Sequence, residues 1–150
     1  MKSIQRNKKA YFDYTILEDF ESGISLLGDE VKSIRKGSVS IKEAYLRIER
    51  DSLEMYIIDM TVEKNPFGTH TAIDTKRKRK MLMHKSQIKR INRQLDEKGL
   101  TLVPLEVYLN ERNIIKFKIG LAAGKKLFDK REIIKRREFE RDKARDFKSF

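Results

Sequence analysis

Cysteine and tryptophan are absent from this chain of 150 residues, and proline and histidine occur only twice each. The absence of cysteine excludes disulfide bonds and every cysteine-based zinc site. Only His70 and His84 offer imidazole, and neither has neighbours at metal-ligand spacing, so we expect neither a metal nor another cofactor. A chain without thiols also suits a reducing compartment, and we expect it in the cytoplasm.

Long apolar runs are missing too. No stretch approaches the roughly 20 apolar residues that a helix needs to span a bilayer. Residues 1–10 are basic, but no apolar segment follows them as it would in a secretory signal. The sequence therefore predicts no membrane partner.

Catalytic patterns are equally scarce. The sequence contains no glycine-rich loop of the Walker type, and no pairing of a nucleophile with a base can be argued from its order. We expect a protein that is not an enzyme. A nuclease built from scattered Glu, His and Lys is a distant alternative.

Positive charge is what the chain has in excess. Its 35 Lys and Arg outnumber 23 Asp and Glu, which leaves a net charge of +12 that favours a polyanionic partner. Most of the basic residues fall in residues 2–9, 76–93 and 124–150, and the first two of these stretches contain no acid. Such clustering is typical of proteins that bind the phosphate backbone of nucleic acids. For residues 76–80 taken alone, a merely solvated surface is an equally good interpretation.

Apolar residues alternate with polar ones at a period of two in several segments, which indicates strands. A turn at residues 110–113 would join two of them into a hairpin. About six short strands of this kind predict a mainly β protein, a small closed barrel with flanking short helices. The strand candidates are residues 14–20, 23–27, 44–48, 53–57, 103–109 and 115–121, and the helix candidates are residues 29–36 and 84–97.

The last part of the chain has a different character. Residues 124–150 contain strong helix formers but no clean apolar stripe, and too few apolar residues to offset the entropy of ordering. We expect a basic tail that is disordered when free and helical on an anionic partner. A solvated terminus without function is the alternative.

Five motifs in order identify a known family. They are NKKAYFDY at residues 7–14, FESGI at 20–24 leading into GDEVKSIRKG at 28–37, RKRKMLMH at 77–84, KGLTLVPL at 98–105 and GKKLFDKR at 124–131. Over essentially its whole length the chain resembles the SsrA-binding proteins, also called small protein B.

The resemblance implies an oligonucleotide-binding-type barrel over residues 1–123 and a flexible basic tail over residues 124–150. It also implies a function. Such proteins bind the tRNA-like domain of transfer-messenger RNA and deliver it to stalled ribosomes, where the tail enters the empty mRNA channel near the decoding centre. We expect a monomer. The runner-up is a general RNA-binding barrel, such as an RNA chaperone or an initiation-factor-like module.

The resemblance also implies site residues. Asn7, Glu21 and Leu82 are expected to contact RNA directly, and Glu21 would accept hydrogen bonds from base amino groups or a 2′-hydroxyl. A salt bridge to a neighbouring Lys or Arg is the alternative for Glu21. Phosphate contacts are expected from Lys8, Lys9, Arg77, Arg79 and Lys80. The ribosome-binding residues of the tail would be Gly124, Lys125, Lys126, Phe128, Asp129, Lys130, Arg131 and Phe139.

Overall fold

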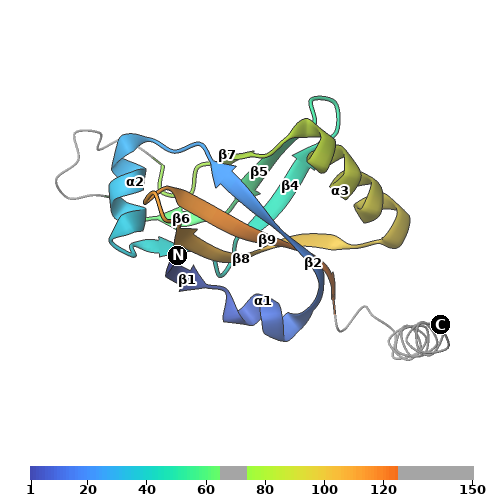
Figure 1. Cartoon of the computed structure of the whole chain (residues 1–150), viewed down its shortest axis with the longest axis horizontal. Coiled ribbons are helices and arrows are strands. Elements are labelled where there is room, and N and C mark those ends of the chain that lie inside the picture. Colours follow the sequence, from blue (N-terminus) through green and yellow to red (C-terminus); the bar gives the residue numbers. More distant parts are fainter. Residues whose placement is uncertain (65–73, 125–150) are drawn as a thin grey trace.

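Strands dominate the described chain, as the alternating pattern predicts. The computed structural model describes residues 1–64 and 74–124 (Figure 1). Within these ranges the helices are α1 (Lys8–Asp13), α2 (Gly28–Arg35) and α3 (Lys85–Lys98). The strands are β1 (Lys2–Arg6), β2 (Tyr14–Ile24), β3 (Val39–Ser40), β4 (Tyr45–Glu49), β5 (Glu54–Ile58), β6 (Thr61–Val62), β7 (Arg79–Leu82), β8 (Thr101–Leu109) and β9 (Ile115–Gly124).

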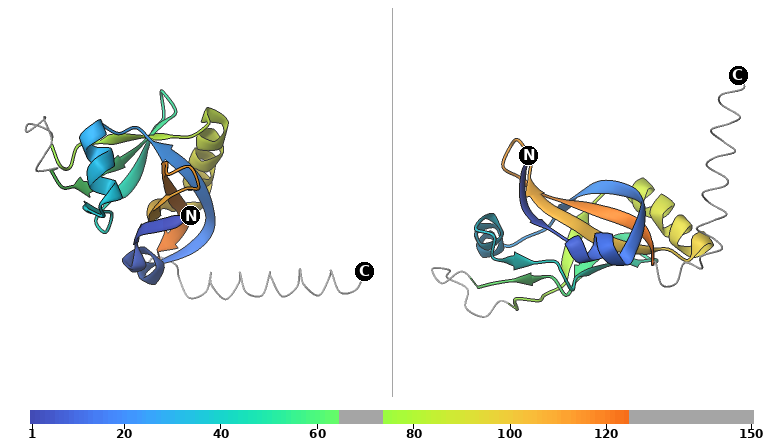
Figure 2. Two further views of the ribbon diagram at one scale, coloured as in Figure 1. Left: turned by 60° about the vertical axis from the view of Figure 1, so that its left-hand side comes forward. Right: turned by 90° about the horizontal axis from the view of Figure 1, so that it is seen from below.

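Seven of these strands form one antiparallel sheet in the order β1-β8-β9-β2-β7-β5-β4. The long strand β2 joins its two halves, because most of it pairs with β9 while Gly23 and Ile24 pair with β7. Strands β3 and β6 make a separate small ladder. In the view of Figure 1, α2 and α3 lie on opposite sides of the molecule, left and right of the strands, and α1 lies below them; Figure 2 gives two further views.

The buried core is formed by the apolar residues that alternate with polar ones along the strands. On β9, Phe117, Ile119 and Leu121 are buried, while Lys116 and Lys118 between them are partly exposed. The expected hairpin between β8 and β9 is confirmed. Asn110 closes its turn, because its Oδ1 accepts hydrogen bonds from the backbone N–H groups of Arg112 and Ile114.

Two of the three helices follow the sequence prediction to within a residue. Helix α3 buries Ile88 and Ile91 and ends at Gly99, whose φ of 60° is the left-handed conformation that a helix C-terminus favours. Helix α1 was not among the predicted helices. Its start is set by Asn7, whose Oδ1 accepts a hydrogen bond from the Ala10 N–H at 3.2 Å.

A mainly β architecture with short helices is confirmed, whereas a closed barrel is not shown. The sheet has two free ends, β1 and β4, and no backbone ladder joins them in residues 1–64 and 74–124. Gln5 of β1 accepts a hydrogen bond from the N–H of Ile41, the residue that follows β3, at 2.8 Å.

Candidate nucleic-acid interface

A groove of about 470 Å³ lies between the outer side of β7 and the start of α3. Three residues predicted to contact RNA, Glu21, Lys80 and Leu82, line it together. Leu82 is 52% exposed although its side chain is apolar, which leaves a hydrophobic surface available to a partner. The groove therefore combines an acid, a base and an apolar side chain from two strands.

Glycine at position 23 allows β2 and β7 to meet at this groove. Gly23 pairs with Leu82, and a β-carbon on Gly23 would lie only 3.2 Å from the Leu82 Cβ. A larger residue at position 23 would require Leu82 to shift by a few tenths of an ångström. The close approach brings Glu21, two residues earlier on β2, beside Leu82.

Glu21 is held by a phenol rather than by a salt bridge. The hydroxyl of Tyr108, a largely buried residue of β8, donates a hydrogen bond to Glu21 Oε2. In residues 1–64 and 74–124, Glu21 has no ion-pair partner, so the salt-bridge alternative does not apply there. Burial, followed by this hydrogen bond, raises the pKa of Tyr108 and keeps the phenol a donor. The carboxylate is thus fixed in orientation while remaining exposed.

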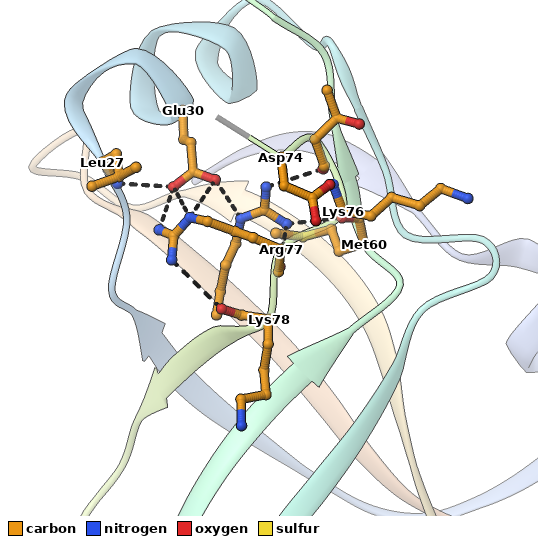
Figure 3. A network of polar contacts seen from close by, with 9 residues as sticks. Leu27, Glu30, Met60, Asp74, Lys76, Arg77 and Lys78 are labelled. Atoms are coloured by element: carbon orange, nitrogen blue, oxygen red, sulfur yellow. Dashed lines mark hydrogen bonds and ion pairs between the residues drawn. The ribbon is translucent and has the colours of Figure 1, made fainter. Parts of the chain in front are cut away.

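The basic run at residues 76–80 is divided by the alternation of the strand that it enters. Lys76, Lys78 and Lys80 are exposed, whereas Arg77 is partly buried and Arg79 is 0% exposed. The interior arginines meet the carboxylate of Glu30 on α2 (Figure 3). The run therefore presents lysines to solvent and arginines to the protein.

Arg79 is the clearest correction to the predicted site. Its Nε donates to Glu30 Oε2 at 2.5 Å, and its Nη atoms donate to the carbonyls of Met60 at 2.8 Å, Arg77 at 3.0 Å and Thr75 at 3.1 Å. A guanidinium without exposed surface cannot contact a phosphate. Sequence spacing alone could not reveal this, because the acid that binds Arg79 lies 49 residues away.

Glu30 is the residue that organises this network. It accepts the Leu27 N–H at 2.9 Å and Arg77 Nη2 at 2.5 Å, in addition to Arg79. Burial alone would raise the pKa of Glu30, but these hydrogen bonds and the positive charge of Arg79 outweigh it, so the pKa lies below its ordinary value. The network ties α2 to the strand that carries the exposed lysines.

Lys78 and Lys80 form only exposed ion pairs. Lys78 Nζ lies 3.2 Å from Glu49 Oε1, and Lys80 Nζ lies 3.3 Å from Glu54 Oε1. Such surface pairs contribute about 0–1 kcal/mol each. A phosphate can replace these carboxylates at little cost.

Asn7, Lys8 and Lys9 lie at a different place, the start of α1. Asn7 is 6% exposed, and its amide is used internally, because Nδ2 donates to the Pro104 carbonyl at 2.9 Å while Oδ1 caps α1. The predicted nucleotide contact of Asn7 is therefore replaced by a structural role. Lys8 and Lys9 are exposed beside a hollow of about 170 Å³ that Lys42 also lines.

The two surfaces lie near opposite ends of β2. The groove adjoins the Ile24 end of that strand, whereas Lys8 and Lys9 precede its Tyr14 end (Figure 1). An 11-residue strand extends over about 35 Å, so one compact ligand group cannot touch both. A large folded RNA can.

Several lining residues were missed by sequence reasoning. His84, Lys85 and Lys116 line the groove, and Lys42 lines the hollow at α1. The alternation on β9 already placed Lys116 on the outer side, but only the strand order brings it beside β7. The sequence held no signal for Lys42.

The remaining predictions concern the C-terminal stretch. Gly124 is the last residue of β9 and pairs with Tyr14. The other tail residues lie outside the described ranges, namely Lys125, Lys126, Phe128, Asp129, Lys130, Arg131 and Phe139.

Residues 1–64 and 74–124 lack two further kinds of feature. They hold no group of three or more His, Asp or Glu side chains placed to bind a metal ion. None of the helices in this part of the chain is long and apolar enough to cross a membrane.

The chain is similar in sequence to proteins of a known family. A family model described as "SmpB protein" matches residues 4–149. An SsrA-binding protein of Coprothermobacter proteolyticus is 44% identical over 148 residues, which cover 99% of this chain and 98% of the relative. An SsrA-binding protein of Fusobacterium nucleatum is 47% identical over 146 residues, or 97% of each chain.

A solved structure extends the likeness to three dimensions. It is described as "tmRNA-SmpB: a journey to the center of the bacterial ribosome" and shares 42% of its residues with this chain at a TM-score of 0.67. The match covers 84% of this chain and 87% of the other. With a family model matched over nearly its full length and close relatives of the same size, the chain belongs to the SmpB family.

Proposed function

We propose that this protein binds the tRNA-like domain of transfer-messenger RNA and delivers it to stalled ribosomes. One observation carries the proposal: Glu21, Lys80 and Leu82 come from distant parts of the sequence and meet in one groove. A carboxylate there selects against phosphate and favours base amino groups or 2′-hydroxyls. The relatives named SsrA-binding proteins and the solved tmRNA-SmpB structure support the same ligand.

Glu21 and the lysines have different roles in RNA binding in this proposal. Lys80, with Lys8 and Lys9 at the far end of β2, supplies phosphate contacts that raise affinity for any RNA. Glu21 is oriented by Tyr108 and supplies selectivity. Arg77 and Arg79 act from inside, by holding β7 against α2 through Glu30.

We further propose that residues 1–123 are the RNA-binding domain and that residues 124–150 act on the ribosome. In this division Gly124, Lys125, Lys126, Phe128, Asp129, Lys130, Arg131 and Phe139 contact the mRNA channel and the decoding centre. The protein acts in the cytoplasm as a non-catalytic, monomeric adaptor. Incubation of labelled RNA with the protein and a divalent metal should leave the RNA uncut.

The sheet completes an oligonucleotide-binding-type barrel in this proposal. Strand β4 lies close to β8, and the hydrogen bond between Gln5 and Ile41 links β1 to the segment that leads from β3 to β4. A curled sheet of this kind buries one face and leaves the other to RNA.

Competition binding at physiological salt tests the main proposal. The labelled ligand is the tRNA-like domain, and the competitors are ordinary tRNA and an unstructured RNA. The full chain is compared with a variant carrying Lys125→Gln, Lys126→Gln, Lys130→Gln and Arg131→Gln. Both proteins should prefer the tRNA-like domain, and only the wild type should support tagging on stalled ribosomes.

Two results would contradict the proposal. Equal competition by all three RNAs would indicate a general RNA-binding barrel, such as a chaperone or an initiation-factor-like module. Loss of binding to the isolated tRNA-like domain in the tail variant would place RNA recognition in the tail. A Glu21→Gln variant isolates the groove, because it should reduce the preference for the tRNA-like domain more than it reduces affinity for the other RNAs.

A further inference from the structure

The outer face of β4, β5 and β7 forms a second surface beside the groove (Figure 1). Its inward residues, such as Leu46, Met55 and Met81, are buried in the core. Its outward residues include Arg47, Tyr56 and Lys80, which are direct neighbours across the three strands. The register thus places an aromatic ring between two cationic side chains.

A cationic side chain lies over the ring of Tyr56. Lys78 Nζ lies 4.3 Å from the centroid of the ring. The hydroxyl donates to Glu54 Oε2 at 2.6 Å, which holds the ring in one orientation. A planar ligand that stacks on this face of the ring would displace the flexible Lys78 side chain.

The charge of the surface suits a phosphate chain. Arg47 has no ion-pair partner in the described ranges, and the ion pairs of Lys78 and Lys80 are with the partly buried acids Glu49 and Glu54. The hydrogen bond to Glu54, followed by burial, raises the pKa of Tyr56 to about 12. The phenol therefore stays neutral at physiological pH and does not repel phosphate.

This face is continuous with the groove. Glu54 and Lys80 flank Tyr56, and both also line the groove with Leu82. An RNA strand that leaves the groove across β7 would meet the Tyr56 ring next. Charged side chains around an aromatic platform are a common arrangement for binding unpaired nucleotides.

We propose that Tyr56 is a stacking platform for an unpaired RNA base, with Arg47, Lys78 and Lys80 binding the flanking phosphates. The proposal rests on the proposed function only in taking RNA as the ligand, and it adds a contact outside the groove. It assigns Tyr56 a role that neither its strand position nor the basic run predicts. An acidic protein segment would use the cations but would have no need of the ring.

Fluorescence of a short single-stranded RNA with one 2-aminopurine tests the stacking. The full-length wild type should quench the fluorophore as it binds, because the base stacks on the ring. Tyr56→Leu should lose most of the quenching and about tenfold or more in affinity. Tyr56→Phe keeps the ring and should retain both the quenching and the affinity to within about threefold.

Charge variants separate the phosphate contacts from the ring. Arg47→Gln should lower the slope of log K against log salt by about one while leaving quenching at saturation intact. Arg112→Gln, at the exposed turn between β8 and β9, removes the same charge elsewhere and serves as the control. Equal effects of both substitutions would overturn the phosphate assignment.

The same proteins distinguish this inference from the proposed function. Quenching by Tyr56→Leu equal to that of the wild type overturns the stacking platform, even when the wild type prefers the tRNA-like domain. Loss of quenching in Tyr56→Leu supports it, even when that preference is absent. If Tyr56→Leu fails to fold by circular dichroism, ultraviolet cross-linking of wild type decides, because the adduct must lie on the tryptic peptide that contains Tyr56.

Discussion

Glu30 carries a full negative charge in the interior, and two arginines make this tolerable. Its carboxylate is 4% exposed and lies 2.5 Å from a nitrogen of both Arg77 and Arg79. Removing two charges from water costs several kcal/mol per ion, which only close hydrogen-bonded pairing offsets. The cluster therefore constrains geometry more than it adds stability, and it determines which basic residues reach the surface.

Glu30→Gln should make the stability of the protein less dependent on acid. The pKa of Glu30 is depressed in the folded state, so its contribution is present above the unfolded-state pKa and is lost as pH falls through the folded-state pKa. Urea unfolding should show the variant less stable than wild type at neutral pH, with a difference that shrinks in acid. A difference that stays constant with pH would show that the charge of Glu30 is unimportant.

Lys80 and Arg79 are neighbours in sequence with opposite expected effects. Lys80→Gln should weaken binding of the tRNA-like domain and lower the salt slope by about one, with unchanged stability. Arg79→Gln should instead destabilise the fold by about 3 kcal/mol or more, because Glu30 loses a buried partner. Salt titrations and urea unfolding of both proteins check this. If Arg79→Gln is as stable as the wild type and also lowers the salt slope, the predicted phosphate contact of Arg79 would be supported after all.

At the scale of elements, α1 shows how one side chain places a basic surface. Asn7 ends β1, caps α1 and ties both to β8 through the Pro104 carbonyl. The backbone N–H of Asn7 also donates to the Leu105 carbonyl at 2.8 Å, and Ala10 of the helix is buried against β8, so the cap acts together with these contacts. Lys8 and Lys9 owe their direction to the cap and these contacts.

Asn7→Ala should therefore lower stability before it affects RNA. Loss of the cap costs about 1 kcal/mol, and the buried Pro104 carbonyl also loses its donor. Lys8→Ala is the matched control, since it should leave the melting temperature unchanged while weakening RNA binding. If Asn7→Ala weakened RNA binding without any loss of stability, a direct nucleotide contact would be indicated instead.

At the scale of the whole molecule, Gln5 links β1, a free end of the sheet, to the segment that leads from β3 to β4. Its Oε1 is the acceptor for the partly buried Ile41 N–H. Gln5→Ala leaves that donor without a partner and should lower the free energy of unfolding by about 1–3 kcal/mol. Gln5→Glu keeps the acceptor and should cost less. Equal stability of all three proteins in urea would show that the hydrogen bond between Gln5 and Ile41 does not stabilise the proposed barrel.

The sequence alone was sufficient for strands β4, β5, β8 and β9, the β8–β9 hairpin, helices α2 and α3, and the excess of positive charge. It divided β2 into two segments and missed the strands β1, β3, β6 and β7. The predicted features depend on neighbours: alternation over a few residues, Asn110 in a turn and Gly99 after a helix all act locally. The family motifs then identified the ligand class and placed Glu21 and Leu82 in a common site.

Tertiary structure alone decided which charged residues of the basic run are exposed to solvent. Residues 76–80 read as one basic run, but pairing with β5 and the presence of Glu30 turn Arg79 inward and leave Lys78 and Lys80 outside. The surroundings of Asn7 and Tyr56 also depend on the tertiary structure. The Asn7 amide donates to the Pro104 carbonyl, and the cationic neighbours of Tyr56 come from two other strands. Burial and ion pairing depend on residues distant in sequence, so only the folded chain determines them.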